Sequence, residues 1–487
     1  MVYLPVELVS NVLLQAVIAR GIKRALRLRL VNKRFYRDVQ SALFESRILD
    51  QFYTGDVLEE WYTDKNQATA LFWHSYLVYR VQHENTLSFP RYLDIRHTAQ
   101  RVCEETGADL VSTIEIICWP ALIRGTNPNN CSRSRAPVKS YLSTPDLNLL
   151  CVAAYLNLIP LATRLIEEGV SPAVESTIFD SPMQLAAWAG NAKMLEKLQE
   201  HLAEVPDTDP QLQAHYRPPC IGKVHQGAIL GAAIRGSMDM VKLAIYPPSR
   251  SSPDSLDING QKCSHVLKRS ATGISLSLAK YATRNLDVWK YLQSLFRAED
   301  REMVYDIRTF ARHGNLEGMK YLLDSGAGFH GVDQDTRWLN PLVVACHWGH
   351  SEIVSLLLER GVDVDYKNNK WVLIYPAICI AARAGNFASV RLLVEHGSKD
   401  DFKNGWVEAF AAAVDLEYIA MARYLLDFGR QVGHHSILEI HGGLILKRAR
   451  ATGQDSMVEF LLQEGITSVG TGRDGVTRYF IFEKYER

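Results

Sequence analysis

Histidine and cysteine side chains come closest to forming a chemical site in this chain, because imidazole and thiolate groups bind metals and act in catalysis. Neither of two short clusters has the complete spacing of a metal site, and the eight cysteines are scattered without a CxxC pair. We therefore expect both clusters to be structural, and we predict no metal and no cofactor. The clusters are Cys346-His347 with His350, and His434-His435 with His441.

Linear signatures of enzymes are also missing: the sequence has no HExxH, GxSxG or GxxxxGK[ST] motif. Residues 470–475 match GxGxxG, which binds dinucleotides only between a strand and a helix. No such elements are predicted there, so we interpret Arg473–Thr477 as a hairpin turn. We predict no catalytic residues and expect a protein that is not an enzyme.

Length and charge narrow the remaining classes. The 487 residues exceed what one hydrophobic core usually supports, which favours several domains or a repeat array. With 54 basic and 54 acidic residues, the chain lacks the overall positive charge of a dedicated binder of nucleic acids or anionic membranes. No membrane-spanning segment or secretory signal is predicted, and the scattered cysteines favour a reducing cytoplasm or nucleus.

The elements that must position any site form a repeat from about residue 147. Small residues precede a glycine, apolar residues follow it at helical spacing, and a second glycine comes twelve positions after the first. The best unit is Asn340–Asp365, where Ile353, Val354, Leu357 and Leu358 form the apolar side of a second helix. The nine anchor positions, spaced by 30 to 48 residues, are Asn157, Gly190, Gly236, Arg284, Gly314, Gly349, Gly385, Glu417 and Gly453.

Glycines at the two fixed positions should end the two helices of each unit, since glycine adopts the left-handed conformation without steric cost. Asn157, Arg284 and Glu417 stand where glycine is expected, which leaves those helix ends open. Two long spacings predict inserted loops, at Ala203–Val224 and Pro247–Gln261. The predicted second-helix stops are Gly169, Gly326, Gly361, Gly397, Gly429 and Gly465.

This pattern resembles the ankyrin repeat family. The resemblance implies a mainly α fold, an α-solenoid with short β-hairpin loops, and a hydrogen bond within the turn from a residue such as His350. It also implies that the residues before each anchor face a concave surface that binds a protein. We expect an acidic or hydrogen-bond-accepting ligand, although some of the rings could instead cover neighbouring helices. The candidate residues are Trp188, Arg235, Arg312, His313, His347, Trp348 and Arg383, with Arg337, Trp338, Tyr366 and Trp371 in adjacent hairpins.

The N-terminal residues predict a separate small helical module, preceding the repeats, at 1–47. An amphipathic helix begins near Glu7, and a second one carries apolar residues from Leu26 to Leu43. Leu-Pro-x-Glu-Leu followed by LRLVNKRFYRDV resembles the F-box, which docks on the Skp1 adaptor of cullin–RING ubiquitin ligases. The resemblance implies adaptor contacts at Leu4, Pro5, Leu8, Val12, Leu30 and Val31.

Residues 20–37 depart from that family in carrying eight basic side chains and no acid. They could steer the module toward an acidic adaptor, serve nuclear import, or form a solvated helix face. Between module and repeats we predict a helical region at 48–123 and a linker at 124–146. The repeats then occupy 147–466, and a truncated repeat or tail occupies 467–487.

These features favour a substrate receptor of a Skp1-type ubiquitin ligase, in which the repeats hold an unknown target protein. A plain ankyrin scaffold with a capping helical pair at its start is the alternative. A third hypothesis is an enzyme that uses a pocket in the repeats or in 48–123.

Overall fold

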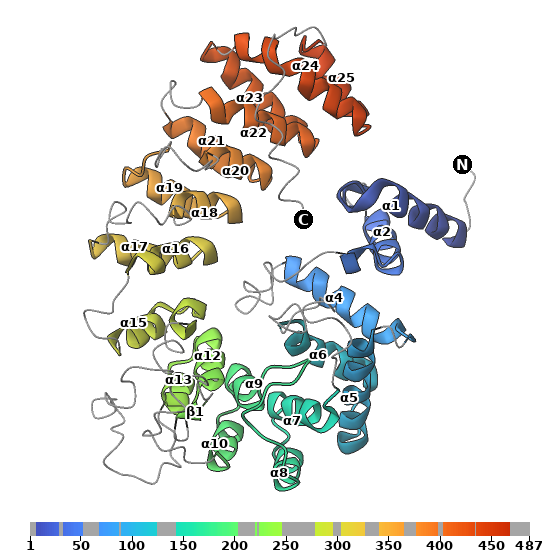
Figure 1. The fold of residues 1–487 in the computed structure, drawn as a ribbon, viewed down its shortest axis with the longest axis vertical. Coiled ribbons are helices and arrows are strands. Elements are labelled where there is room, and N and C mark those ends of the chain that lie inside the picture. The colour runs from blue at the N-terminus through green and yellow to red at the C-terminus, as the bar shows by residue number, and fades with distance from the viewer. Residues whose placement is uncertain are drawn as a thin grey trace, which may run out of the picture. The chain divides into compact units, whose positions relative to one another are not determined.

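The computed structural model divides the chain into two compact units, Met1–Asp300 and Arg301–Arg487 (Figure 1). The two are treated separately below. The residues that the structure describes are 6–28, 33–51, 68–86, 89–123, 143–202, 220–221, 224–245, 278–295, 303–326, 340–364, 376–397, 403–433 and 435–467.

The first unit begins with three elements that share one small core. Leu13 and Val17 of the first helix are buried against Val39 and Leu43 of the second, together with Tyr76 from the region that follows. The three elements are α1 (Val6–Leu28), α2 (Lys33–Glu45) and the 3-10 helix η1 (Ile48–Gln51).

The boundary between these first helices differs from the prediction. Leu26 belongs to α1, which continues to Leu28, and the second helix starts only at Lys33. Gly21 lies within this helix, but one helical glycine costs only about 1 kcal/mol relative to alanine, and most of the residues that follow it are good helix formers. The predicted inter-helix basic stretch is therefore partly helical.

The described residues of the region predicted as helical at 48–123 form, after η1, the helices α4 (Ala68–His83), α5 (Pro90–Thr106) and α6 (Leu110–Ile123). Their buried side chains are continuous with those of the first repeats, since Ile95 and Ile117 share one core cluster with Leu149 and Ala186. The α5 helix packs directly on α7. The region therefore covers the end of the repeat stack in this unit.

Repeats of the first unit are helical pairs whose first helices, α7, α9 and α12, pack on one another in succession. Among the described residues, β-structure is confined to the antiparallel hairpin of β1 and β2, which pairs Cys220 with His225. The elements are α7 (Pro145–Tyr155), α8 (Ile159–Glu167), α9 (Pro182–Ala189), α10 (Ala192–Glu200), β1 (Cys220–Ile221), β2 (Val224–His225), α12 (Gln226–Arg235), α13 (Met238–Ile245) and α15 (Leu286–Ser294).

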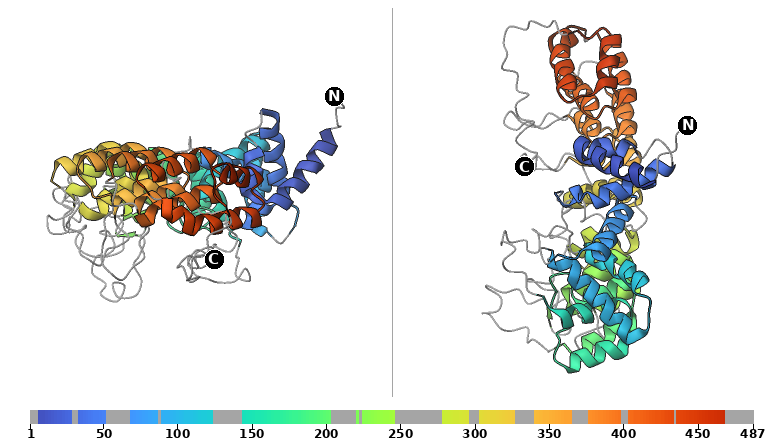
Figure 2. Two further views of the ribbon diagram at one scale, coloured as in Figure 1. Left: turned by 90° about the horizontal axis from the view of Figure 1, so that it is seen from above. Right: turned by 90° about the vertical axis from the view of Figure 1, so that its right-hand side faces the viewer.

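The second unit continues the same construction, and its helical pairs follow one another along the stack (Figures 1 and 2). First helices pack in the order α16, α18, α20, α22, α24, while α19 lies between α17 and α21. The elements are α16 (Met303–His313), α17 (Leu316–Asp324), α18 (Pro341–Trp348), α19 (Ser351–Glu359), α20 (Ala377–Arg383), α21 (Phe387–His396), α22 (Lys403–Asp415), α23 (Ile419–Gln431), α24 (His435–Ala451) and α25 (Asp455–Gln463).

The anchor positions explain where first helices end. The anchor glycines have positive φ, and so do two of the exceptions, Asn157 (φ 61°) and Glu417 (φ 52°). The third exception, Arg284, is not among the positive-φ residues. A left-handed residue thus ends most first helices, even where the position carries a Cβ.

One of the predicted second-helix stops is wrong. Gly397 does end α21, although its backbone is extended (φ −80°) and not left-handed. Gly429, however, lies inside α23, whose end is marked instead by Gly433 (φ 78°). A Cβ at Gly429 would overlap the fully buried Trp406 ring, so this glycine permits close packing rather than a turn.

The remaining predicted boundaries fall as follows. The α7 helix starts at Pro145, two residues inside the predicted linker, while residues 124–142 of that linker lie outside the described residues. So do Arg473–Thr477, the 247–261 insert and all but the first residue of the 467–487 tail. Among the described helices, none combines the length and the hydrophobicity needed to cross a membrane.

Candidate protein-interaction surfaces

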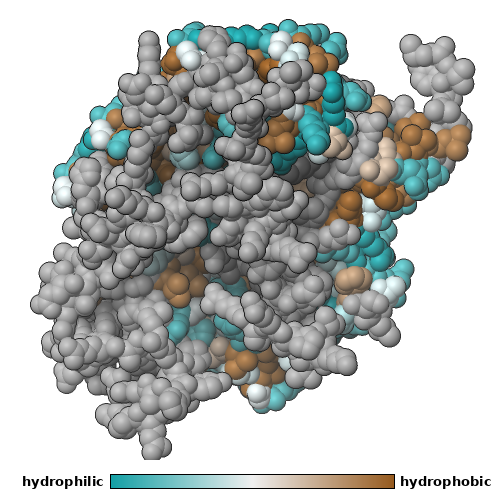
Figure 3. Space-filling model, turned by 45° about the horizontal axis from the view of Figure 1, so that its top comes forward, coloured by the Kyte–Doolittle hydropathy of each residue, from teal (hydrophilic) through white to brown (hydrophobic). Residues whose placement is uncertain are grey.

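The first candidate surface is the outer side of α1, which is amphipathic. Leu13 and Val17 point into the module core, whereas Leu8 and Val12, one turn apart, are 51% and 63% exposed. Hydrophobic side chains are visible on the surface of this helix in Figure 3. Single exposed apolar residues are common, but two in succession on one helix face form a small hydrophobic patch.

The other predicted adaptor contacts, Leu4, Pro5, Leu30 and Val31, lie outside the described residues. Ile18, which the sequence analysis did not select, is exposed on the same helix. Helix periodicity could have found it. Gln15 is exposed on the outer side of α1, and residues three positions apart lie on the same side of a helix.

Aromatic side chains hold the module against α4. The Phe44 ring of α2 lies 5.6 Å from Phe72, 5.2 Å from Tyr76 and 5.7 Å from Tyr79, centroid to centroid. Aromatic pairs at such distances add about 1 kcal/mol each beyond their buried area. The patch on α1 therefore belongs to a module that is fixed to the helices behind it.

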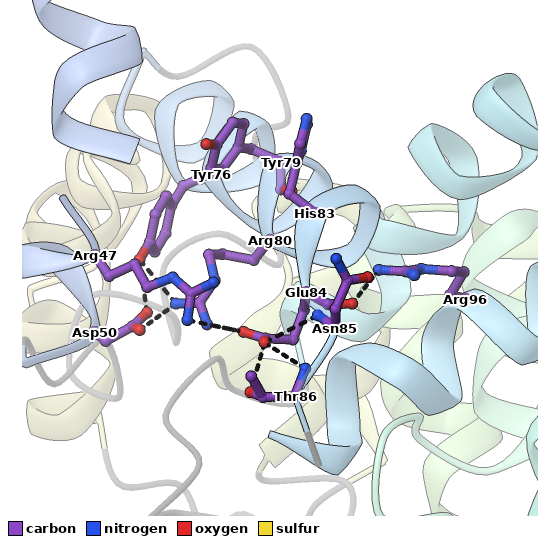
Figure 4. A network of polar contacts seen from close by, with 10 residues as sticks. All are labelled: Arg47, Asp50, Tyr76, Tyr79, Arg80, His83, Glu84, Asn85, Thr86 and Arg96. Carbon is purple, nitrogen blue, oxygen red and sulfur yellow. Dashed lines mark hydrogen bonds and ion pairs between the residues drawn. The ribbon is translucent and has the colours of Figure 1, made fainter. Parts of the chain in front are cut away.

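A buried arginine makes the second link between the module and α4 (Figure 4). Arg80 is almost fully buried and forms an ion pair with Asp50 of η1, while its Nη2 donates to Glu84 Oε2 at 2.5 Å. Tyr76 donates its hydroxyl to Asp50 Oδ1 at 2.6 Å. The guanidinium also lies over the Tyr92 ring, 4.7 Å from the centroid. Asp50 of η1, an element that shares the core of the module, is thus bound to α4 by a charge and two hydrogen bonds.

Hydrogen bonds and charges set the protonation of this network. Burial alone would raise the pKa of Glu84, but hydrogen bonds from Thr86 and Arg80 lower that pKa to about 2. Burial and the neighbouring Asp50 raise the pKa of Tyr76, and they raise the pKa of Tyr92 to about 12. The Glu84 carboxylate and the Arg80 guanidinium are therefore charged, and the two phenols neutral, over the whole physiological range.

The sequence analysis did not detect this network. A signal was present: Arg80 is the one Lys, Arg, Asp or Glu in the stretch 68–83, which is largely apolar and aromatic. A charged residue on such a helix is almost never buried unless it is paired. The partners, however, could not be named without the fold.

The second candidate surface is built from the ends of the first helices, and side chains of the next repeat cover the carbonyl groups there. The residue after the anchor donates backward: Asn191 to the carbonyls of Ala154 and Tyr155, each at 2.9 Å, and Asn285 to that of Gly236 at 3.1 Å. These bonds satisfy C-terminal carbonyls that the helix itself leaves open. They also join consecutive repeats.

At α9 this arrangement changes, with consequences for two predicted contact residues. The residue after the next anchor is Ser237, which is short, and Arg235 instead donates to the carbonyls of Trp188 (3.2 Å) and Ala189 (2.7 Å). Its positive charge suits the negative end of the α9 dipole. Arg235, predicted as a partner contact, is thus a helix cap. Trp188 is only 8% exposed and packs near Tyr155, which limits its access to a partner.

In the second unit, His350 and Asn386 perform this capping. The His350 Nε2 donates to the Arg312 carbonyl at 2.9 Å, and Asn386 Nδ2 donates to the Cys346 carbonyl at 2.7 Å and that of His347 at 3.2 Å. The predicted local turn bond of His350 is therefore corrected: the imidazole joins two repeats.

Around these caps the structure brings four predicted residues together at the ends of α16, α18 and α20. The Arg312 guanidinium lies over the Trp348 ring, 5.5 Å from its centroid, and the His347 ring meets the same ring edge-on at 4.9 Å. The pKa of His347 is lowered, first by partial desolvation and then by the positive charges of Arg312 and Arg383. We call Arg312, His347, Trp348 and Arg383 the cationic strip.

The other predicted residues contribute less to this surface. His313, the last residue of α16, is half-buried, and Arg337, Trp338, Tyr366 and Trp371 lie outside the described residues. No cluster of three metal-binding side chains occurs in the described part of the chain. Burial raises the pKa of the Cys346 thiol, which suits a hydrophobic core residue better than a metal ligand.

Comparison with known proteins agrees with the repeat pattern. The family described as ankyrin repeats in three copies matches residues 307–368. This segment consists of ankyrin repeats. A region of 183 residues, 37% of the chain, is 27% identical to a Caenorhabditis elegans homolog of transient receptor potential cation channel subfamily A member 1, and it covers 14% of that protein's length. The match therefore concerns a small part of that relative.

Among solved structures, the human ASB11 ankyrin repeat domain is similar over 51% of this chain and 83% of its own, with 20% identity and a TM-score of 0.22. The predicted fold class, a mainly α solenoid, is confirmed. Stacked ankyrin repeats are protein-interaction scaffolds. The predicted F-box resemblance stays a prediction.

Proposed function

We propose that this protein is the substrate receptor of a Skp1-type ubiquitin ligase, with α1 docking the adaptor and the ankyrin repeats holding a target protein. Such a receptor performs no chemistry of its own: it raises the effective concentration of the target near the ubiquitin-transfer machinery. It would act in the cytoplasm or nucleus.

One observation carries the proposal: Leu8 and Val12, which the F-box resemblance assigns to the adaptor, are exposed on α1 while their neighbours Leu13 and Val17 are buried. An apolar pair left in water on a fixed helix is the kind of patch that a partner covers. The Arg80–Asp50 pair supports the same function, because a receptor must hold its docking module at a constant position relative to its own fold.

The test is copurification of the full chain with a Skp1 adaptor. We expect wild type to retain the adaptor, and Leu4→Ala/Pro5→Ala and Val12→Asp to lose most of it. Val111→Asp is the matched control, since Val111 is a 52% exposed valine on α6. Equal recovery with Val12→Asp and wild type, or no recovery with either, would contradict the proposal.

A scaffold unrelated to ubiquitin is the second candidate, and the packing of Phe44 on Phe72 and Tyr76 favours it. In that case the module is a helical cap that protects α4 from water. Deleting residues 1–47 would then lower the stability of the helices at 68–123 without affecting any adaptor. The two candidates are separated by Val12→Asp, which leaves the Phe44 contacts in place.

A further inference from the structure

The outer side of α1 carries more exposed apolar surface than the two residues assigned to the adaptor. Leu8, Val12 and Ile18 are 51%, 63% and 52% exposed, and other exposed side chains lie between them. Positions three or four apart lie on the same side of a helix, so these side chains form one row about 17 Å long. We call this row the α1 stripe, and it consists of Leu8, Asn11, Val12, Gln15, Ile18 and Ala19.

The opposite side of the same helix is already occupied. Leu13 and Val17 are buried in the core that α1 shares with α2, η1 and α4. The stripe therefore faces away from that core. Scattered apolar residues are normal on a protein surface, but three aliphatic side chains in one row are typical of a face that another molecule covers.

The stripe carries no charge. Residues 8–19 contain no Asp, Glu, Lys, Arg or His. A strongly charged partner would lose hydration on this surface without meeting an opposite charge. A second copy of the same chain brings the same neutral surface, so two stripes can meet without burying a charge.

The order of side chains along the stripe suits an antiparallel pair. Its apolar members Leu8 and Ile18 have position 13 as their midpoint. Its two amides, Asn11 and Gln15, have the same midpoint, which is next to Val12. Turned end to end, the stripe thus shows the same order of apolar and amide groups. Each amide can donate through its NH2 group and accept through its oxygen, so asparagine and glutamine can bond each other.

Charge at the end of α1 favours the same orientation. Beyond the stripe the helix continues to Leu28, and residues 20–27 contain four basic residues and no acid. A parallel pair would bring the two basic ends together, where they repel. An antiparallel pair keeps them at opposite ends of the contact.

We propose that α1 pairs in antiparallel orientation with α1 of a second copy of this chain, across a two-fold axis near Val12. Leu8 of each copy lies against Ile18 of the other, and Asn11 lies against Gln15. The contact is short, so the pair is weak and forms reversibly. The consequence for regulation rests on the proposed function: receptors without adaptor pair, and the adaptor separates them because it binds the same stripe.

The test is the oligomeric state of the purified full chain without adaptor, measured by sedimentation equilibrium up to the highest soluble concentration. Wild type is expected to shift from monomer toward dimer as the concentration rises. Val12→Asp places two carboxylates together at the axis and should raise the dimer dissociation constant about tenfold or more. Val111→Asp is the matched control, since Val111 is a 52% exposed valine on α6, and it should pair as wild type does.

An exchange of charges tests the orientation. Leu8→Lys alone and Ile18→Asp alone should each weaken the pair, because a charge then faces an apolar side chain. Leu8→Lys/Ile18→Asp should restore the pair, since each new lysine then meets an aspartate of the other copy. In a parallel pair the double variant would instead set like charges against each other.

A monomer at every concentration, or a Val12→Asp chain that pairs as strongly as wild type, would overturn the inference. A double variant that pairs more weakly than both single variants would overturn it as well. Circular dichroism checks that the helices are unchanged in each variant. Adaptor copurification is measured separately on wild type. A dimer that retains no adaptor contradicts only the proposed function, and a monomer that retains the adaptor contradicts only this inference.

Discussion

The His350 imidazole donates from Nε2 to the backbone carbonyl of Arg312 at 2.9 Å, across 38 positions of sequence. The same ring lies against Gly314, where a Cβ would come within 2.6 Å of its nearest atoms. One side chain therefore caps α16, packs on its terminal glycine and joins two repeats. Asn386 and Asn191 occupy the same place in their own repeats.

Replacing His350 by alanine should weaken the junction between α16 and α18. The Arg312 carbonyl then has no hydrogen-bond donor from His350, and Gly314 loses the imidazole ring that packs on it. We therefore expect the free energy of unfolding of the second unit to fall by about 1–2 kcal/mol. Urea unfolding monitored by tryptophan fluorescence measures this loss. His396→Ala is the control, since His396 is exposed and bonds only within its own helix. Equal effects of the two substitutions would argue against a junction role.

Gly429→Ala should be strongly destabilising, although alanine is the better helix former. A Cβ at this position would overlap the Trp406 ring, which is fully buried and donates from its indole nitrogen to the Leu425 carbonyl at 2.6 Å. Forcing such an overlap costs about 1–3 kcal/mol or more. Gly433→Ala, where a Cβ meets nothing within 4 Å, should cost only the left-handed strain of about 1 kcal/mol. A thermal melt that ranks the two in the opposite order would refute this account of Gly429.

Arg80→Met should loosen the N-terminal module. It leaves the fully buried Glu84 carboxylate with only the longer ion pair to Arg47, at 3.5 Å. Removing one partner of a buried pair costs about 3–5 kcal/mol, and Arg47 should reduce that loss. We expect faster hydrogen exchange in α1, α2 and α4, and partial recovery in Arg80→Met/Glu84→Gln. Exchange unchanged in α1 and α2 would mean that the Phe44 contacts alone hold the module.

The same carboxylate gives a pH dependence. The pKa of Glu84 is lowered to about 2 in the folded state. Its contribution to the free energy of unfolding is therefore complete when the pH is above its ordinary pKa of about 4.5. It is lost as the pH falls from about 4.5 to about 2, where the unfolded chain binds the proton first. Glu84→Gln should flatten the acid branch of the stability curve in that window, and an unchanged branch would count against it.

His225 should produce a separate effect at milder pH. Burial lowers the pKa of this histidine from 6.5 to about 4, and its neutral ring bonds the Ala173 carbonyl at 3.0 Å and accepts from the Ala228 amide at 3.3 Å. Its contribution is complete above pH 6.5 and falls as the pH drops toward 4, because the unfolded chain gains the proton first. The loss amounts to about 3 kcal/mol at most.

Unfolding curves between pH 7 and pH 4 check this prediction in wild type and His225→Asn. Asparagine can still cap α12 but does not titrate, so the decline over this range should be shallower. His201→Asn, a change at an exposed histidine of the same unit, should keep the slope of wild type. Equal slopes in all three proteins would exclude His225 as the cause.

The repeats could be predicted because the sequence pattern that determines each unit lies within that unit. Small residues, an anchor and the apolar set of Ile353, Val354 and Leu357 recur at nearly constant spacing, and the helices follow that spacing. Asn157 and Glu417 could not be settled in this way, since their left-handed backbone depends on the packing around them. The prediction that Gly429 ends a helix was wrong for the same reason, because only the fold places Trp406 against this glycine.

Contacts between distant residues account for what the sequence did not reveal. Asp50 and Arg80 are 30 positions apart, and nothing local pairs them. Arg235 was predicted to contact a partner, but it caps α9 instead, because Ser237 is too short to reach the α9 carbonyls. By contrast, Leu8 and Val12, which the F-box resemblance assigns to the adaptor, are both exposed on α1.

The length of the side chain that follows each anchor has a wider meaning for the array. Where this residue is a serine, the arginine two positions before it caps the preceding helix. Where it is an asparagine or a histidine, that side chain caps the preceding helix itself. In Ser237→Asn, the asparagine should therefore cap α9 in place of Arg235, and the arginine side chain should face outward. A change at a residue that touches no partner could thus alter what the surface recognises.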